Sequence, residues 1–128
     1  MNLIALDPGR KRVGVAISHG IMAEAFAVLE FDINDSESFV ANLRKIIDEQ
    51  KIKKIIVGLP LGGEGTKTDQ TCFSEEFARK LKEYIDLPFE MVEESFSTSY
   101  AHDLGAKKEN VDSQAAKIIL EQYLNENS

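Results

Sequence analysis

Residues 3–18 read LIALDPGRKRVGVAIS, and this stretch decides the fold. An apolar strand ends on one carboxylate, Asp7, and a tight basic turn then leads into a second apolar strand that runs back beside the first. An acid at the tip of a buried strand is accessible to a ligand, and the turn beside it offers cations and backbone amides. This combination suits a metal ion and a phosphate, so it indicates phosphoryl-transfer chemistry.

The composition predicts one globular domain over residues 1–128. A chain of this size buries roughly two-thirds of its unfolded surface, so it can hold a core without disulfides, and Cys72 is expected in that core. No apolar run approaches the roughly 20 residues that span a bilayer, and no signal peptide is seen, so a cytoplasmic protein with no membrane contact is expected. The net charge of -7 argues against nonspecific binding to a polyanion but does not exclude a nuclease.

The hydrophobic pattern predicts a mixed α/β sheet. Strands are expected at residues 2–7, 12–19, 24–31, 54–58 and 88–93, and helices after residue 36 and at 73–85, 97–104 and 112–124. Loops are expected at 59–68 and 105–111. Apart from the short helix at 97–104, the order is β-β-β-α-β-α-β-α, a meander followed by strand–helix alternation, which predicts one five-stranded mixed sheet with helices on both faces.

Acidic residues are expected to meet at one edge of this sheet. Asp7 ends the first strand and Asp112 begins the last helix, while Glu93 and Glu94 end the fifth strand, where at most one of them can face the site. If the first strand neighbours the fourth and the fifth lies beyond it, their carboxyl ends share the edge where open α/β sheets bind ligands. Mg²⁺ and Mn²⁺ prefer oxygen ligands, and two such ions about 4 Å apart can activate water and stabilise a leaving oxygen.

Each of these acids also has a structural explanation. Asp112 is a good helix N-cap. Asp7 could form a salt bridge with Arg10 or Arg12, but a charge beside Leu6 costs several kcal/mol if it is buried without a partner. Asp7 is therefore the hardest of the acids to explain without a ligand.

Phosphate contacts are predicted from a turn and two further segments. The candidates are Arg10, Lys11, Arg12, Gly62, Gly63, Gly65, Ser97 and Thr98. The glycines permit close backbone approach to a phosphate, although the loop lacks the Gly-Lys-Ser/Thr of a Walker A loop and could be a plain connection. Ser97 and Thr98 would equally suit the cap of a short helix. His19 and His102 form no zinc pattern.

Four segments match the motifs of a known family. An Asp-x-Gly turn with basic residues and Gly-x-Ala falls on residues 7–16, and Val-Gly-Leu-Pro-Leu falls on 57–61. An Asp-Glu-Arg-x-Thr/Ser-Thr segment falls on 93–98, and an Asp-x-x-Ala-Ala helix start falls on 112–116. On these motifs the chain, over essentially its whole length, resembles the YqgF family, described as Holliday junction resolvases and as pre-16S rRNA nucleases.

This resemblance implies an RNase H-like three-layer α/β/α fold with catalytic, metal-binding acids at Asp7, Glu94 and Asp112. Two departures from the family pattern concern the substrate. Ser95 stands where the family usually has an arginine, which removes a cation that could bind a phosphate bidentately. Gly62 and Gly63 stand where the family usually has asparagine and a larger residue.

The sequence thus predicts a Mg²⁺- or Mn²⁺-dependent endonuclease of the two-metal-ion type, acting on nucleic acid, either precursor ribosomal RNA or branched DNA. A homodimer would bring two sites to a four-way junction, although the apolar pattern isolates no dimer face. One alternative is a non-catalytic nucleic-acid or protein-binding module on the same fold, which the acidic balance and Ser95 favour. Another is a sugar kinase or actin-like ATPase, which needs a second lobe with the same turn, and this chain carries no repeat of the motif.

Overall fold

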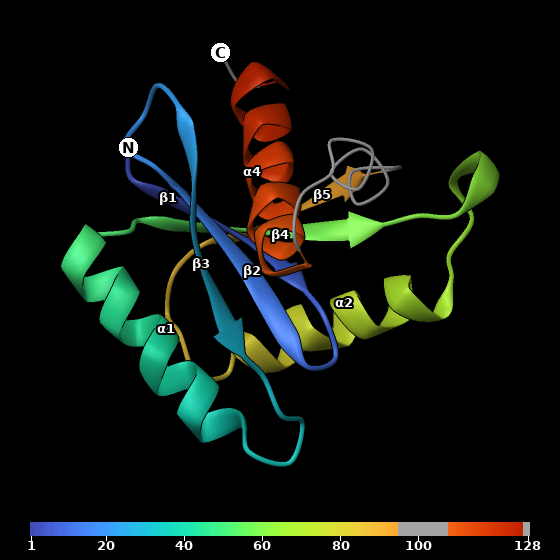
Figure 1. The fold of residues 1–128 in the computed structure, drawn as a ribbon, viewed down its shortest axis with the longest axis horizontal. Coiled ribbons are helices and arrows are strands. Elements are labelled where there is room, and N and C mark those ends of the chain that lie inside the picture. The colour runs from blue at the N-terminus through green and yellow to red at the C-terminus, as the bar shows by residue number, and fades with distance from the viewer. Residues whose placement is uncertain (95–107, 127–128) are drawn as a thin grey trace.

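The computed structural model describes residues 1–94 and 108–126, and within them five strands form one mixed sheet (Figure 1). The strands are β1 (Leu3–Pro8), β2 (Arg12–Ser18), β3 (Ala23–Glu30), β4 (Lys54–Pro60) and β5 (Phe89–Glu94). The helices are α1 (Ser36–Gln50), α2 (Asp69–Leu81) and α4 (Lys108–Glu126), and Gly63–Gly65 forms a single 3-10 turn. None of these helices is both long enough and apolar enough to cross a membrane.

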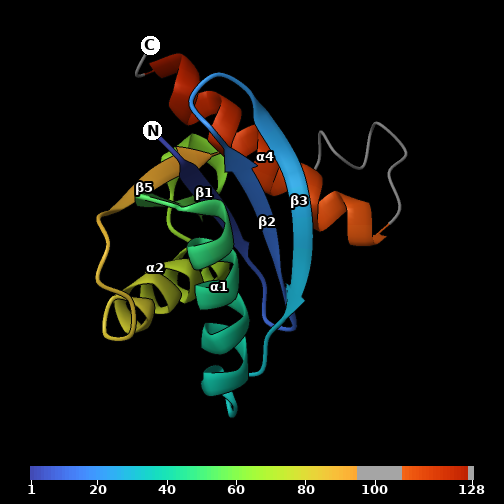
Figure 2. The same cartoon turned by 90° about the vertical axis from the view of Figure 1, so that its left-hand side faces the viewer.

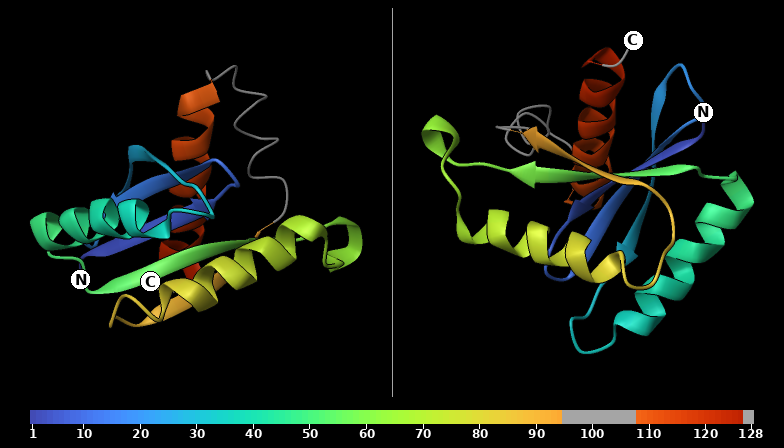
Figure 3. Two further views of the ribbon diagram at one scale, coloured as in Figure 1. Left: turned by 90° about the horizontal axis from the view of Figure 1, so that it is seen from below. Right: turned by 180° about the vertical axis from the view of Figure 1, so that it is seen from behind.

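The strand order is β3-β2-β1-β4-β5. β1 is antiparallel to β2 and parallel to β4, and β4 is parallel to β5. The strand order on which a shared edge for the first, fourth and fifth strands depends is therefore present. Figure 3 (right) shows the carboxyl ends of β4 and β5 pointing to the same end of the sheet.

Helices cover both faces of the sheet, as Figure 2 shows: α1 and α2 lie on one side and α4 on the other. Side chains alternate along each strand, so the sheet feeds two separate hydrophobic clusters. Ile4, Leu6 and Val15 belong to the cluster under α1 and α2. Leu3 and Ala5 belong to the cluster under α4.

Small residues line the contact between α4 and the sheet. Ala5, Ala16 and Ala23 of the strands share one cluster with Ala116 of α4, and all four side chains are buried. Small side chains let a helix lie close to a sheet, and any larger one would force the two apart because protein interiors are close-packed. These alanines therefore let α4 lie close to the strands at this part of the contact.

Ala116→Leu is expected to lower the free energy of unfolding by about 1–3 kcal/mol, because the added carbons have no space between α4 and the sheet. Ala41→Leu, on the exposed side of α1, should change it by less than about 0.5 kcal/mol. Urea denaturation measures both variants. Equal denaturation midpoints for Ala116→Leu and the wild type would contradict close packing at this contact.

A polar contact also joins α4 to β4 and β5. Lys54 on β4 donates hydrogen bonds from Nζ to the Tyr123 hydroxyl of α4 at 2.9 Å and to Glu90 of β5 at 3.1 Å. The bond to Tyr123, and then that to Glu90, raises the pKa of Lys54 above its ordinary value. The Lys54 ammonium therefore stabilises the fold at neutral pH.

This stabilisation should disappear as the pH rises through the raised pKa of Lys54. The stability difference between the wild type and Lys54→Met is expected to shrink, by less than about 1 kcal/mol, at pH values above about 10.4. Urea denaturation at neutral and alkaline pH measures it. A difference that stays constant with pH would show that the ammonium contributes nothing.

Three sequence expectations need correction. The helix predicted at 73–85 ends at Leu81, and Ile85 is buried from the segment after it. Cys72 is exposed, not in the core, because the buried stripe of α2 runs through Thr71 and Ser74 and position 72 points away from it.

The last helix begins at Lys108, so residues 108–111 are helical rather than loop. No glycine or proline stands between Gly105 and Asp112 to stop the helix. The helix expected at 97–104 lies outside the described residues.

Candidate active site

The candidate site is centred on Asp7, near the carboxyl end of β1. Leu3 and Ala5 face α4, so the alternation along β1 places the half-buried Asp7 side chain on the same side of the sheet. The antiparallel partner of Asp7 is Gly14, so no side chain opposes the carboxylate across the ladder. The strand thus presents an acid to the α4 side, where a ligand can reach it.

The turn after Asp7 is held by local sterics and by α2. An added Cβ at Gly9 would lie 2.5 Å from the Arg12 carbonyl oxygen, so only glycine fits this turn. Gln70 of α2 donates from Nε2 to the Pro8 carbonyl at 2.9 Å. These contacts hold the backbone on the carboxyl-terminal side of Asp7. Gln70 was not predicted as part of the site, since no local sequence signal links α2 to this turn.

The end of β5 brings Glu94 to the same end of the sheet. Glu94 is paired with Pro60 in the β4–β5 ladder, two residues after Val92, which packs against α4. Glu93 is exposed and alternates with Met91, which packs toward α1 and α2. The strand spacings put the Cα atoms of Asp7 and Glu94 about 12 Å apart. Two acidic side chains and a cation between them can span that distance.

The helix α4 runs obliquely across the sheet and brings in position 112. Its C-terminal half is tied to β5, because Gln122 donates from Nε2 to the Glu93 carbonyl at 3.0 Å. Its N-terminal part lies beside β2 and β3, where Gln114 borders a hollow with Arg12. Asp112 is one turn before Ala116, whose side chain packs on the sheet. It lies inside the helix, so the N-cap explanation of Asp112 is wrong.

The donor set fits a hard divalent cation in its chemistry. The side chains of residues 1–93 and 113–126 are described, and no three His, Cys, Asp or Glu among them are grouped to hold a metal. The side chains of Glu94 and Asp112 lie outside the described residues, so this observation does not test the predicted triad. The three backbone positions come from β1, β5 and α4, and oxygen-only ligands suit Mg²⁺ or Mn²⁺.

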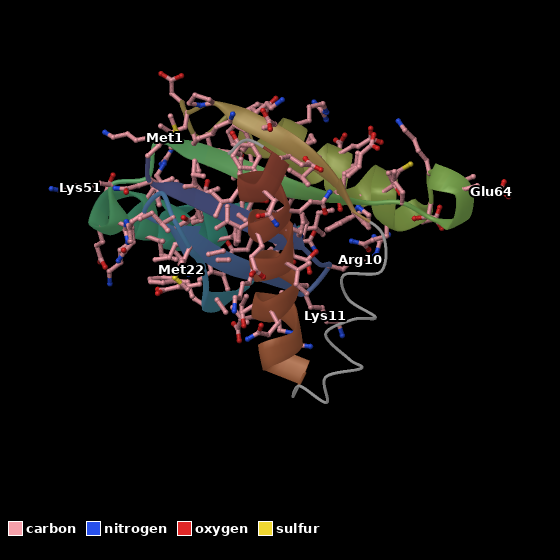
Figure 4. The ribbon with its side chains drawn as sticks, turned by 90° about the horizontal axis from the view of Figure 1, so that it is seen from above. Met1, Arg10, Lys11, Met22, Lys51 and Glu64 are labelled. Atoms are coloured by element: carbon pink, nitrogen blue, oxygen red, sulfur yellow. The ribbon has the colours of Figure 1, made fainter. Side chains whose placement is uncertain are left out.

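The basic residues of the β1–β2 turn lie at this same end. Figure 4 shows Arg10 and Lys11 there, opposite the end that carries Met1 and Lys51. The Arg10 guanidinium lies 4.8 Å from the centre of the Phe73 ring, while the Lys11 side chain is exposed. Arg12 is half-buried at the start of β2. The three cations therefore have different surroundings, and two of them are exposed.

The glycine-rich loop projects from the same end, with Glu64 at its tip (Figure 4). Its amides are partly used inside the loop: Gly62 donates to the Thr66 carbonyl at 2.7 Å, and Gly65 donates to the Gly62 carbonyl at 3.1 Å. In this conformation the amides of Gly62 and Gly65 are engaged inside the loop. Of the three glycines predicted to contact phosphate through the backbone, Gly63 remains. Ser97 and Thr98 lie outside the described residues.

The sheet order and the helices on both of its faces define an RNase H-like fold. Solved structures share it. RuvC from Thermus thermophilus is similar with a TM-score of 0.57 and 10% identity, over 99% of this chain and 97% of that one. The fowlpox virus resolvase, solved with substrate Holliday junction DNA, gives 0.60 and 9%, over 99% of each chain.

The chain belongs to the RuvX family, whose family model is described as Holliday junction resolvase and matches residues 1–126. Its relatives include proteins called "Putative pre-16S rRNA nuclease". The one from Maridesulfovibrio salexigens is 36% identical over 97% of this chain and 98% of its own. The one from Buchnera aphidicola is 36% identical over 96% of each. The resemblance recognised from the sequence motifs is confirmed.

Proposed function

We infer that this protein is a divalent-metal-dependent endonuclease that hydrolyses phosphodiester bonds in structured nucleic acid. The observation that carries this function is Asp7, an accessible carboxylate at the end of a buried strand, on the side of the sheet covered by α4. The proposal adds Glu94, at the end of β5, and Asp112, in α4, as the two further acids of the cluster that such a nuclease needs. A sugar kinase or actin-like ATPase would need a second lobe, and this chain is matched by one family model from residue 1 to 126.

Asp7, Glu94 and Asp112 are the residues that would hold Mg²⁺ or Mn²⁺, as one ion or as a pair. A divalent cation held by these carboxylates would supply positive charge beside the phosphodiester and a more acidic bound water. The chain's own part is to orient the three carboxylates from three separate elements. The close turn at Gly9 and the hydrogen bond from Gln70 of α2 to the Pro8 carbonyl hold the backbone that follows Asp7.

Lys11 and Arg10 would hold the phosphates that flank the scissile bond. Both are exposed beside the strand end that carries Asp7, and cations at that place attract a polyanion to an acidic protein. Ser97, Thr98 and the amide of Gly63 are further candidates for phosphate contacts. Because Ser95 replaces a family arginine, one bidentate phosphate contact is missing.

The substrate is proposed to be either a precursor of 16S ribosomal RNA or a Holliday junction, the two named for the family and for its relatives. A homodimer would suit the junction, since it presents two strands for cleavage. The experiment compares labelled substrates, a four-way DNA junction and a precursor ribosomal RNA end, with Mn²⁺ and with EDTA. Asp7→Asn protein is the control for contaminating nucleases.

Cleavage that requires Mn²⁺ and Asp7 supports the endonuclease, and the preferred substrate identifies its role. Folded wild-type protein that binds but cleaves neither substrate would overturn the enzyme and favour the non-catalytic binding module. In that event, Ser95→Arg is the first variant to examine, because it restores the cation that the family usually has.

A further inference from the structure

The edge strand β3 carries an exposed aromatic residue on a bulge. Val15 of β2 is paired with Ala27, but its neighbour Ala16 is paired with Ala25, so Phe26 is the extra residue of the ladder. Its side chain is 41% exposed. β-Bulges re-aim a side chain, and they are frequent near active sites. Among the described residues, Phe26 belongs to neither of the two hydrophobic clusters.

Phe26 borders a hollow between β3 and the N-terminal part of α4, the two elements seen together in Figure 2. The hollow has a volume of about 650 Å³, and Arg12, Glu30 and Gln114 also line it. Ala25, Ala27, Val28 and Ser113 complete the lining, so an aromatic ring and aliphatic groups lie beside one cation, one anion, one amide and one hydroxyl. These groups can contact a ligand with a flat face and a polar edge.

The hollow adjoins the candidate active site. Asp7 is paired with Gly14 in the β1–β2 ladder, and Gly14 is paired with Val28 in the β2–β3 ladder. Val28 also lines the hollow. Val28 is two strand spacings from Asp7, about 10 Å. Arg12 and Gly14 are two residues apart on β2 and therefore face the same side of the sheet. Gly14 is the partner of Asp7, so the hollow and the Asp7 carboxylate lie on that side. A nucleotide one or two positions from the scissile phosphate would reach it.

We propose that this hollow is a subsite for an unpaired nucleobase of the substrate, stacked on Phe26. This proposal rests on the nuclease function and assigns its substrate a single-stranded segment beside the cleavage point. Every base has a face that stacks on an aromatic ring, and Gln114 offers both a donor and an acceptor to a base edge. Unpaired bases are accessible to such contacts, whereas stacked and paired bases are not.

Charge decides which part of the nucleotide enters the hollow. Glu30 and Arg12 are cross-strand partners in the β2–β3 ladder, so a carboxylate accompanies the guanidinium at the lining. Glu30 adds a negative charge to the lining, so it would repel a phosphate but accept a hydrogen bond from a base amino group. The chain's net charge of -7 also makes sequence-independent attraction to nucleic acid weak, so contacts to bases must contribute more.

The test measures binding without cleavage. Fluorescence anisotropy in EDTA gives dissociation constants for a short single strand, as RNA and as DNA of the same sequence, and for the matching duplex. Phe26→Ala is expected to weaken binding of the preferred single strand about 5- to 100-fold and to leave duplex binding unchanged. Phe26→Tyr should retain the affinity because the ring remains, and Phe26→Leu should lose it because the ring is gone. 2-Aminopurine in the strand should be quenched by the wild type and not by Phe26→Ala.

Tyr84→Ala is the matched control, since Tyr84 is 43% exposed and lies beside α1 and α2 on the opposite side of the sheet. It should not change any of these constants. An unchanged single-strand affinity in Phe26→Ala overturns the subsite, as does an equal loss for duplex and single strand, or no measurable single-strand binding by the wild type. A thermal unfolding curve like that of the wild type excludes misfolding as the cause.

The two proposals can fail separately. Loss of single-strand binding in Phe26→Ala, with no cleavage of any substrate by the wild type, would support the subsite and overturn the nuclease. If the wild type cleaves with Mn²⁺ and Phe26→Ala has the same KM, the nuclease is supported and the subsite is overturned. If both hold, Phe26→Ala should raise KM for a substrate with unpaired bases far more than it lowers kcat.

Discussion

Asp7→Asn is expected to lower the rate of Mn²⁺-dependent cleavage by at least about 10³-fold while the protein stays folded. The amide has the size of the carboxylate but no charge, so it is a poor ligand for a hard cation. Asp7 is half-buried at the end of a strand whose other residues from Leu3 to Leu6 are buried, so the strand pairing and the core are unaffected. The melting temperature should therefore change by only a few degrees.

The metal can be followed without the reaction. A cation that binds only the folded protein raises its melting temperature, and this rise should occur in the wild type and be lost in Asp7→Asn. Asp86→Asn, an exposed acid in the loop before β5, is the matched control and should keep both the rise and the cleavage. Normal cleavage by Asp7→Asn would remove Asp7 from the site and with it the proposed mechanism.

Neighbouring glutamates at the end of β5 should differ sharply. Glu94→Gln is expected to reduce cleavage roughly 10²- to 10³-fold, and Glu93→Gln to leave it within a factor of about three. The reason is that side chains alternate along β5. Position 94 is on the same side of the sheet as Val92, which packs under α4 on the side of Asp7. Glu93 is on the same side as Met91, which packs toward α1 and α2. The two substitutions are chemically identical and adjacent, so each controls for the other.

Initial rates at saturating Mn²⁺, and again over a range of Mn²⁺ concentrations, measure this pair. A metal ligand should show its loss most strongly at low Mn²⁺, because the amide weakens metal binding before it affects the reaction. A larger effect of Glu93→Gln than of Glu94→Gln would mean that the end of β5 is rotated relative to the described register. Equal, negligible effects would leave Asp7 and Asp112 as the acids of the site.

Much of the fold could be predicted because its signals are local. The run from Leu3 to Ser18 alternates apolar residues on either side of a turn, and the bounds of β1 and β2 follow to within one residue. The α1 start is equally local, since Asp35 accepts a hydrogen bond from the Ser38 amide as an N-cap should. The same holds for the position of Asp7, because a strand end next to an Asp-x-Gly turn is a feature of sequence alone.

The features that the sequence predicted wrongly, or did not predict, depend on residues that are distant in the chain. Cysteine is a residue type that is usually buried. The rotation of α2 against the sheet is set by Phe77 and Leu81, however, and this rotation leaves Cys72 exposed. The start of α4 at Lys108 depends on a balance of weak propensities that a single breaker such as Gly105 does not decide. The glycine-rich loop uses the amides of Gly62 and Gly65 for its own bonds, which no count of glycines reveals.

By itself, the sequence determined the order of the strands and helices, the basic turn after Asp7 and the motifs that place the chain in its family. These depend on periodicity, turn chemistry and residue identity, all of which act over a few neighbouring residues. Only the tertiary structure decided that β1 lies between β2 and β4, that α4 crosses obliquely over small residues, and that the bulge exposes Phe26 beside a hollow. Pairing register and helix position are set by packing between segments far apart in the chain, where the free energy depends on how surfaces fit together.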